Sequence, residues 1–437
     1  MIVLAFSGGL DTSFCVPFLK ETYGEDVTTV TVDTGGLTDA GKAALEEKAI
    51  NLGAARHFTV DAKQHLYDNI LAYLIKGNIQ KGQLYPLCVG PERVSQSIQV
   101  AKVAVELGAS AIAHGSTGAG NDQVRFDMAF QLLAPGLRIM APIRDFSLSR
   151  AETTEYLEAR GFDVPVKTTQ YSINSGLWGT TVGGKETRTP ELALPDHAFT
   201  TTNSIDECPE SALDITIGFK NGLPVSFNGV ETSGISIIEK LNEVGSLHGV
   251  GRGIHVGDTI LGIKGRVGFE APGALILITS HRELEKIVLT KWQLYQKTQT
   301  ADMYGMLLHE GQFFDPVMRD MEAYLDSSQD VVEGEVRVRL HKGNLQVTGC
   351  SSPYSLFDTG VAVYGEENTG WGPDDARGFG KILTNQAALA MAARSSVNGQ
   401  QSTKMSSITG QQSAKQSSVN GQQSTVGDGH QSEGISH

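Results

Sequence analysis

Short apolar runs alternate with amphipathic stretches along the first 165 residues of the chain. Each run is bounded by turn residues, and the runs lie at 1–6, 27–33, 55–61, 110–115 and 137–142. The stretches at 38–53 and 91–108 have helical spacing, and the first opens on Thr38, a capping residue, and closes on Gly53. Apolar strands that alternate with helices of this length are typical of a parallel sheet covered on both faces. We therefore predict a doubly wound α/β domain over residues 1–165.

The pattern changes after residue 165. Residues 166–380 are Gly-rich and mix strand and helix signals with long irregular connections, which predicts a second, α+β domain. An Ala- and Leu-rich stretch at 381–394 predicts a C-terminal helix. From 395 an 11-residue period begins, and each unit holds one clearly apolar residue and a helix-breaking Gly, so the repeat can bury no core. We predict a disordered tail over residues 395–437.

Composition narrows the range of partners. The 437 residues include Lys+Arg 35 and Asp+Glu 49, a formal charge of -14, which argues against nucleic acid as the main partner. Without a window of roughly 18 apolar residues, we expect no membrane span. The first six residues read as a strand and not as a signal peptide. The four cysteines are far apart and show no metal spacing, so reduced thiols in a cytoplasmic protein are expected.

The first loop with candidate chemistry is "SGGLDTS", residues 7–13, where the first strand becomes a helix. Two glycines expose successive backbone N–H groups, and a helix N-terminus adds its positive dipole end, so the loop suits a phosphate or pyrophosphate. The same glycines would also suit a plain strand-to-helix turn. The chain lacks both G-x-x-x-x-G-K-[ST] and G-x-G-x-x-G at this position, which argues against a Walker-type NTPase and a dinucleotide-dependent dehydrogenase.

The second loop is "AHGSTGAGNDQVRF", residues 113–126, at the end of another predicted strand. It offers uncharged donors at Ser116 and Thr117, a carboxylate at Asp122 and a guanidinium at Arg125. Such a set suits a ligand with both ammonium and carboxylate groups, which describes an amino acid. Taken alone, Asn121 and Asp122 could instead be a helix cap, with Arg125 in a surface ion pair.

Together the two strings resemble a known family. "SGGLDTS" after an N-terminal strand is similar to the PP-loop of the ATP pyrophosphatase superfamily, and "HGSTGAGNDQVRF" is similar to the motif of the argininosuccinate synthases. The resemblance continues in "LNEVGSLHGVGR" and covers residues 1 to about 390. It implies a nucleotide-binding domain at 1–165 and a synthetase and oligomerisation domain at 166–380.

The family condenses L-citrulline with L-aspartate at the expense of ATP, giving argininosuccinate, AMP and pyrophosphate through a citrullyl-adenylate, in arginine biosynthesis. The resemblance therefore implies a ligase with ATP as co-substrate, Mg²⁺ on the polyphosphate and a homotetrameric assembly. Positioning of the substrates and electrostatic stabilisation at the transferring phosphorus would provide most of the catalysis. No side chain is predicted as a nucleophile, and no protein metal site is predicted.

The resemblance also assigns candidate binding residues. Those expected at ATP are Ala5, Phe6, Ser7, Gly8, Gly9, Leu10, Asp11, Thr12, Ser13, Val32 and Gly115. Those expected at aspartate are Thr117, Asn121 and Asp122. Those expected at citrulline are Tyr85, Asn121, Arg125, Ser172 and Thr181.

The chain departs from the family pattern at four citrulline positions, and at one of them Thr181 stands for a Ser and keeps a hydroxyl. Gly90 stands where a Ser is expected, Gly257 where a Glu is expected and Phe269 where a Tyr is expected. Asp258, next to Gly257, is one residue that could compensate. The departures leave open a PP-loop adenylating enzyme that acts on a different ureido or carbonyl substrate or on tRNA, and a nucleotide-binding protein that has lost turnover.

Overall fold

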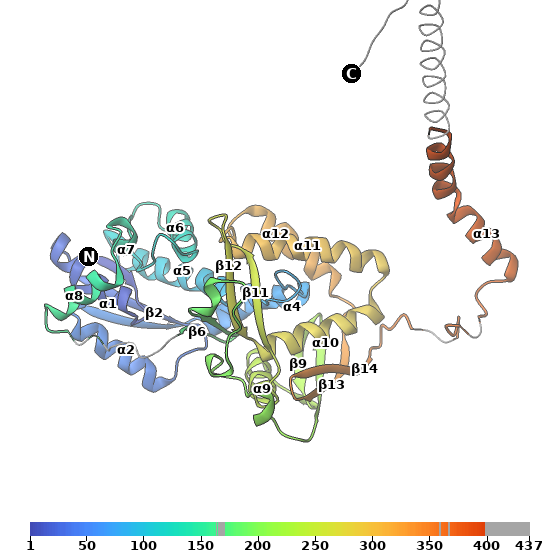
Figure 1. The fold of residues 1–437 in the computed structure, drawn as a ribbon, viewed down its shortest axis with the longest axis horizontal. Helices are drawn as coiled ribbons and strands as arrows, with labels where there is room; N and C mark the ends of the chain where they lie inside the picture. Colours follow the sequence, from blue (N-terminus) through green and yellow to red (C-terminus); the bar gives the residue numbers. More distant parts are fainter. Residues whose placement is uncertain (163, 165–170, 358–359, 366–367, 398–437) are drawn as a thin grey trace, which may run out of the picture. The chain divides into compact units, whose positions relative to one another are not determined.

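The computed structural model describes residues 1–162, 164, 171–357, 360–365 and 368–397. Residues 1–357 form one compact unit, and the residues from 358 onward are a second one (Figure 1). The predicted boundary at 165/166 falls inside the first unit and stays a prediction. The predicted tail lies outside the described residues from 398 onward, and residues 395–397 are helical.

A five-stranded parallel sheet forms from the apolar runs of the first 165 residues. Its order is β3-β2-β1-β4-β5. The strands are β1 Ile2–Ala5, β2 Val27–Asp33, β3 Arg56–Asp61, β4 Ala111–Ala113 and β5 Arg138–Met140. The helices of this region are α1 Leu10–Tyr23, α2 Asp39–Asn51, α3 Lys63–Leu66, the π-helical η1 Tyr67–Leu71, α4 Ala72–Gly77, α5 Val89–Glu106, α6 Asp122–Leu133, α7 Pro142–Asp145 and α8 Arg150–Glu158.

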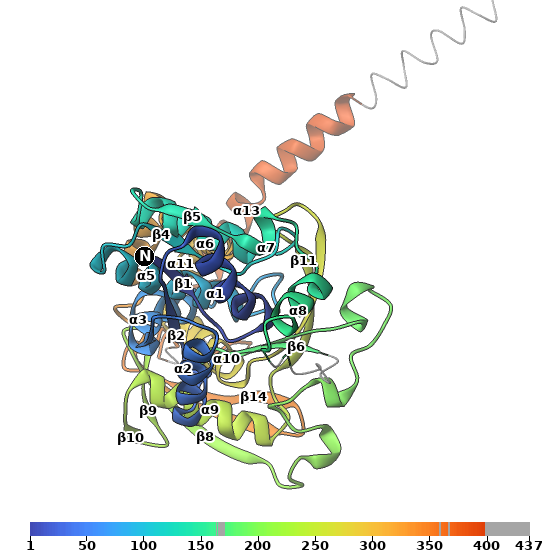
Figure 2. The ribbon, with the colours of Figure 1, turned by 90° about the vertical axis from the view of Figure 1, so that its left-hand side faces the viewer.

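Both faces of this sheet are buried, which confirms the doubly wound prediction. Successive side chains of a strand point to opposite faces. Ile2 and Leu4 of β1 accordingly belong to a cluster with Phe14 of α1, whereas Val3 packs with Val100 of α5. Figure 2 shows α1 and α5 on opposite sides of β1. The strand order reverses between β1 and β4, and the crevice beyond such a reversal is where ligands bind in open α/β sheets.

Residues 171–357 contain two antiparallel sheets, as expected for an α+β region. One sheet has the order β10-β9-β8-β13-β14 and the other the order β11-β12-β7-β6. The strands are β6 Ser172–Ser175, β7 Thr180–Gly183, β8 Leu213–Lys220, β9 Leu223–Phe227, β10 Val230–Glu231, β11 Arg252–Asp258, β12 Lys264–Glu270, β13 Gly334–His341 and β14 Asn344–Ser351. The helices are η2 Glu186–Arg188, η3 Asp196–Ala198, η4 Ile205–Glu207, α9 Gly234–Leu247, α10 Pro272–Val288, α11 Lys291–His309 and α12 Pro316–Ser328.

The largest core joins segments that are far apart in the chain. Leu74 and Ile75 of α4 pack in it with Ile217 of β8 and with Ile276 of α10, all fully buried. Since α4 lies inside the predicted nucleotide-binding region, its apolar side chains tie that region to the antiparallel half. This packing holds strands β6, β7, β11 and β12 next to the crevice of the parallel sheet.

The second unit contains α13, Pro373–Leu383, and a helical stretch at 385–397. No side chain of α13 is buried, and Phe379, Ile382 and Leu383 are each about two-thirds or more exposed. Among the residues that the structure describes, no helix is both long enough and apolar enough to cross a membrane.

Candidate active site

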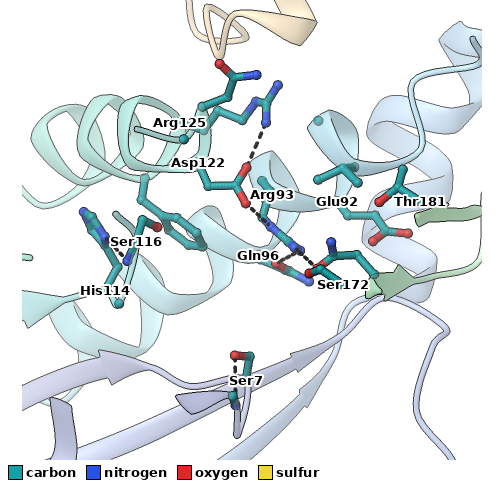
Figure 3. Close-up of a pocket in the computed structure, with 18 of the residues that line it drawn as sticks. Ser7, Glu92, Arg93, Gln96, His114, Ser116, Asp122, Arg125, Ser172 and Thr181 are labelled. Carbon is teal, nitrogen blue, oxygen red and sulfur yellow. Dashed lines mark hydrogen bonds and ion pairs between the residues drawn. The ribbon is translucent and has the colours of Figure 1, made fainter. Parts of the chain in front are cut away.

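A cavity of about 980 Å³ opens at the carboxyl ends of β1, β2 and β4, and strands β6, β7, β11 and β12 complete its wall (Figure 3). All of the residues predicted to bind substrates line it, except Gly8 and Ser13. Those that line it are Ala5, Phe6, Ser7, Gly9, Leu10, Asp11, Thr12, Val32, Tyr85, Gly115, Thr117, Asn121, Asp122, Arg125, Ser172 and Thr181.

The loop at residues 7–13 is held by its own hydrogen bonds. Gly8 has a φ of 69°, a conformation that favours glycine, and a Cβ there would lie 2.3 Å from Leu45 Cδ2. Its carbonyl accepts from Lys48 Nζ at 2.6 Å and from the Ser13 hydroxyl at 3.4 Å. The two predicted residues that do not line the cavity thus support the loop, and the first amides of α1 follow it directly.

The two sequence loops meet at one point of the crevice. A Cβ on Gly115 would lie 2.9 Å from Thr12 Cγ2 and 3.1 Å from Thr12 N. Glycine therefore lets the loop after β4 approach the start of α1 within van der Waals contact. A phosphate at the first loop and a ligand at the second would consequently be neighbours.

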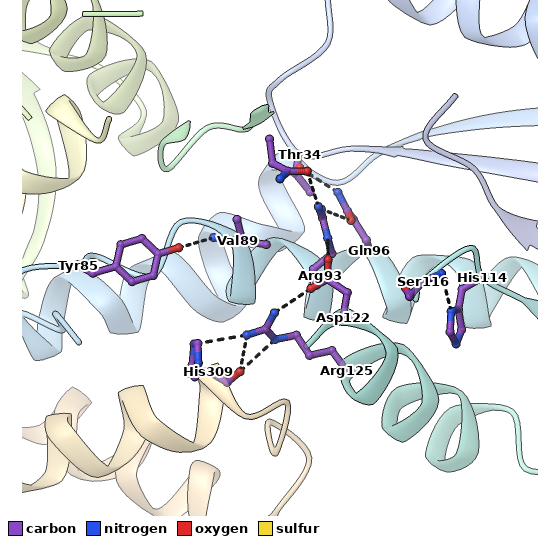
Figure 4. Close-up of polar contacts among 11 residues, drawn as sticks. Thr34, Tyr85, Val89, Arg93, Gln96, His114, Ser116, Asp122, Arg125 and His309 are labelled. Atoms are coloured by element: carbon purple, nitrogen blue, oxygen red, sulfur yellow. Dashed lines mark hydrogen bonds and ion pairs between the residues drawn. The ribbon is translucent and has the colours of Figure 1, made fainter. Parts of the chain in front are cut away.

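Asp122, at the start of α6, links two guanidinium groups (Figure 4). Its Oδ2 accepts from Arg93 Nε at 3.0 Å and its Oδ1 from Arg125 Nη1 at 2.8 Å. Burial alone would raise the pKa of Asp122, but the two guanidinium groups outweigh it and hold the pKa below the usual value. The carboxylate therefore stays charged and orients both arginines, of which Arg93 also bonds Asn174 Oδ1 at 3.1 Å.

Arg125 is 4% exposed and reaches from α6 to the end of α11. Its Nε and Nη2 donate to the His309 carbonyl at 3.0 Å and 2.7 Å. Burial and the charges of Arg125 and Lys81 lower the pKa of His309 to about 3, so this imidazole is neutral at pH 7. Nη2 also lies 3.4 Å from His309 Nδ1, so one N–H of Nη1 remains at the cavity wall, where a substrate carboxylate could accept from it.

Other residues of the second loop are held in place by side-chain contacts. Asn121 Oδ1 accepts from the Ile260 amide at 3.0 Å, which leaves its NH₂ group for a ligand. His114 is 1% exposed and bonds Asp127 through Nε2 at 2.9 Å, and its Nδ1 accepts from the Ser116 amide at 3.2 Å. His114 therefore fixes the backbone of the second loop through its bond to the Ser116 amide.

The far wall of the cavity is built around Tyr85. Its hydroxyl accepts from the Val89 amide at 3.3 Å, and its ring lies 5.4 Å from those of His255 and Phe269. A Cβ on Gly257 would lie 2.5 Å from His255 Nε2, so the imidazole occupies the space beside this glycine. His255 Nε2 is buried and has no hydrogen-bond partner.

Comparison with known proteins identifies the family of this chain. Residues 1–163 match the model of the arginosuccinate synthase N-terminal HUP domain, and residues 171–421 match that of the arginosuccinate synthase C-terminal domain. The chain belongs to the argininosuccinate synthase family. An argininosuccinate synthase from Methanocaldococcus jannaschii is 40% identical over 84% of this chain and 92% of its own length. Those from Pyrobaculum aerophilum and Xanthomonas axonopodis pv. citri are 41% and 42% identical, over 90% and 89% of this chain and 98% and 94% of their own lengths.

Membership of the argininosuccinate synthase family confirms the predicted enzyme class, a ligase of arginine biosynthesis that uses ATP to join citrulline and aspartate. The roles of individual residues stay predictions. The compensation considered for Gly257 stays a prediction: Asp258 lines the cavity, and its carboxylate is 68% exposed and pairs with Lys264 at 2.6 Å.

Among the residues of this argininosuccinate synthase cavity that sequence reasoning missed, four bear on its charges and packing. Glu92, Arg93, His255 and His309 all line it. Arg93 and Glu92 stand in "YPLCVGPER", close to Gly90. Because a predicted helix starts in that segment, its first charged residues could have been considered as candidates for the site. His255 is two residues before Gly257 on β11, and the period of a strand places both on one face. His309 gave no local signal, because only packing brings α11 to Arg125.

Proposed function

We propose that this chain condenses L-citrulline with L-aspartate, with cleavage of ATP to AMP and pyrophosphate, and so forms argininosuccinate. The observation that carries the proposal is the contact between the loop at residues 7–13 and the loop at 113–126 across Gly115 and Thr12. A phosphate-binding turn and an amino-acid-binding loop in one cavity suit a reaction in which a substrate oxygen attacks the α-phosphorus of ATP.

On the nucleotide side, we infer that the backbone amides at the start of α1 bind the departing pyrophosphate, with the hydroxyls of Ser7 and Thr12 as further donors. Residues around Val32 and Gly115 would hold the adenosine. Since the phosphate loop has no lysine of the Walker type, it serves cleavage between the α and β phosphates better than transfer of the γ-phosphate.

On the amino-acid side, Thr117, Asn121 and Asp122 are the proposed aspartate contacts, and Tyr85, Asn121, Arg125, Ser172 and Thr181 the proposed citrulline contacts. The ureido oxygen of citrulline attacks the α-phosphorus first, which turns a poor leaving group into AMP. The aspartate amine then attacks the activated carbon. Arg125 and Asp122 would align these two steps, because both are fixed by ion pairs before any substrate binds.

Mg²⁺ is part of the proposal as a partner of the ATP polyphosphate. Among the residues that the structure describes, no group of three or more His, Cys, Asp or Glu side chains could hold a metal ion. Mg²⁺ keeps several waters and takes most of its ligands from phosphates, so the proposal needs no such group. Asp11 is the carboxylate of the phosphate loop that would lie near the ion. The ion would neutralise part of the phosphate charge.

We also propose a homotetramer in the cytoplasm, with residues 1–165 as the nucleotide-binding domain, 166–380 as the synthetase and oligomerisation domain and 381–394 as an exchanged helix. The exposed apolar side chains of this segment, Ile382, Leu383, Leu389 and Met391, support assembly through it. The four free cysteines suit a reducing compartment. Sedimentation equilibrium of the full chain tests the assembly.

The test of the activity is pyrophosphate release from ATP with citrulline and aspartate, each omitted in turn. We expect release that depends on citrulline, and argininosuccinate only when aspartate is also present. Pyrophosphate release that does not depend on citrulline would favour a different ureido or carbonyl substrate or a tRNA. Arg125→Ala should raise the citrulline KM far more than the ATP KM, and Arg339→Ala, which removes an exposed arginine, serves as control. Equal effects on both KM values would contradict the role of Arg125.

A further inference from the structure

One acidic side chain faces the cavity without a full set of partners. Glu92, in the first turn of α5, is 3% exposed and lines the cavity. Its Oε1 is buried and accepts no hydrogen bond. A buried carboxyl oxygen without a donor is costly unless a ligand supplies one. A hydrogen-bond donor of the bound substrate could therefore pair with the Glu92 carboxyl group.

The packing around Glu92 directs its carboxyl group toward β6 and β7. A Cβ on Gly176, in the turn between these strands, would lie 1.5 Å from Glu92 Oε1. The glycine thus provides the space that the carboxyl group fills. Figure 3 shows the carboxyl group beside Thr181, one of the residues proposed to contact citrulline.

The other carboxylates of the cavity wall are already engaged. Asp122 holds two arginines, and Asp258 pairs with Lys264. Asp11 belongs to the phosphate loop. Among the described residues that line the cavity, Glu92 is therefore the carboxyl group that remains for a cation on the amino-acid side.

The position that resemblance assigns to an acidic citrulline contact holds no side chain in this chain. That position is Gly257 on β11, and the ring of His255 fills the space next to it. A glutamate there would collide with the imidazole, and the carboxylate that β11 does bring to the cavity, Asp258, pairs with Lys264. A positive group of the substrate must find its counter-charge on another element.

We propose that Glu92 binds the α-ammonium group of the citrulline substrate and so replaces an acidic side chain of β11 with one of α5. The proposal rests on the proposed function for the identity of the amino acid. It makes Glu92 a specificity-determining residue, because a ureido acid without an α-amino group would leave the buried carboxyl group unpaired.

The charge state of Glu92 agrees with this role. Burial raises its pKa to about 8, and neighbouring Arg93 and the Thr34 hydroxyl oppose this only in part. Before substrate binds, the group is therefore mostly protonated at pH 7. An ammonium ion beside it favours the carboxylate, so citrulline binding should release close to one proton.

The test is titration calorimetry of the full-length protein with citrulline and with 5-ureidopentanoate, which lacks the α-amino group. Measurements at pH 7 in two buffers of different ionisation heat count the protons released. Glu92→Gln should weaken citrulline about 10- to 100-fold, the loss of one buried charge-assisted hydrogen bond, and abolish proton release. It should change the affinity for 5-ureidopentanoate less than threefold. Glu106→Gln, an exposed change on the same helix, is the control.

Gly176→Ala is a second variant, because its methyl group would displace the Glu92 carboxyl group, and it should give the same selective loss. Equal weakening of both ligands, unchanged citrulline affinity or no citrulline binding by the wild-type protein would overturn the proposal. Measuring pyrophosphate release in parallel distinguishes a failure of this proposal from a failure of the proposed function. Release that persists while Glu92→Gln has no effect refutes only the role of Glu92. Citrulline binding that depends on Glu92 without release refutes only the reaction.

Discussion

Replacing Asp122 with asparagine tests whether the arginine pair is the positioning device of the amino-acid site. The carboxylate now accepts from Arg93 at 3.0 Å and from Arg125 at 2.8 Å. An asparagine of the same shape keeps one acceptor oxygen and turns an NH₂ group toward the other guanidinium. One charge-assisted bond is lost, and the buried Arg125 and the partly buried Arg93 lose their shared counter-charge.

The structure bounds the size of the effect. A hydrogen bond to a charged group contributes about 1.5–3 kcal/mol. The Asp122 side chain is 34% exposed toward the cavity, so solvent screens it in part and the lower half of that range applies. A loss of about 2 kcal/mol corresponds to roughly a 30-fold fall in kcat/KM. We expect this fall for both aspartate and citrulline, and less than a threefold change in the ATP KM, because Asp122 does not contact the phosphate loop.

The assay is initial-rate pyrophosphate release, with each substrate varied while the other two are saturating. Asp214→Asn is the matched control, because Asp214 pairs with Arg339 at 2.8 Å on the exposed surface and should leave all three kcat/KM values unchanged. Rates within twofold of wild type for Asp122→Asn would refute the reasoning. A loss shared equally by ATP and the amino acids would do so too, since it would indicate general damage to the fold.

Two further predictions follow from the packing. Gly115→Ala places a methyl group 2.9 Å from Thr12 Cγ2, so the two loops must separate; we expect roughly a tenfold rise in the ATP KM, whereas Gly136→Ala, with open space around it, should change nothing in the same assay. Burial lowers the pKa of His281 to about 4 from 6.5, so its contribution to stability is present above pH 6.5 and is lost as the pH falls toward 4, by roughly 3 kcal/mol in total. Urea unfolding across this range checks it, and His281→Gln should flatten the acid limb; an unchanged slope would contradict the assignment.

The parallel sheet could be predicted from the sequence because its determinants are local. Each strand is a short apolar run between turn residues, and the cap predicted at Thr38 is present, with its hydroxyl accepting from the Gly41 amide at 3.1 Å. Strand ends of a parallel sheet meet at one edge, so the order of strands and loops along the chain was enough to bring the loops at 7–13 and 113–126 together.

Other features depended on packing between distant segments. The β6–β7 turn is held against the loop after β2, where the Leu177 amide donates to the Thr34 carbonyl at 3.0 Å. The end of α11 meets α6 at Arg125, whose guanidinium donates to the His309 carbonyl. The hydrophobic periodicity of the sequence does not predict such contacts, because each joins residues more than a hundred positions apart.

The sequence by itself determined the fold class of the first 165 residues and the positions of the two loops proposed to bind phosphate and amino acid, because chain geometry and side-chain period act over a few residues. Only the tertiary structure decided which charges of the cavity are already neutralised. Asp122 and Asp258 are paired there, whereas Glu92 Oε1, buried next to Gly176, has no hydrogen-bond partner. The reason is physical: burial and partners set the charge and the binding capacity of a carboxyl group, and both arise from segments that meet only in the folded chain.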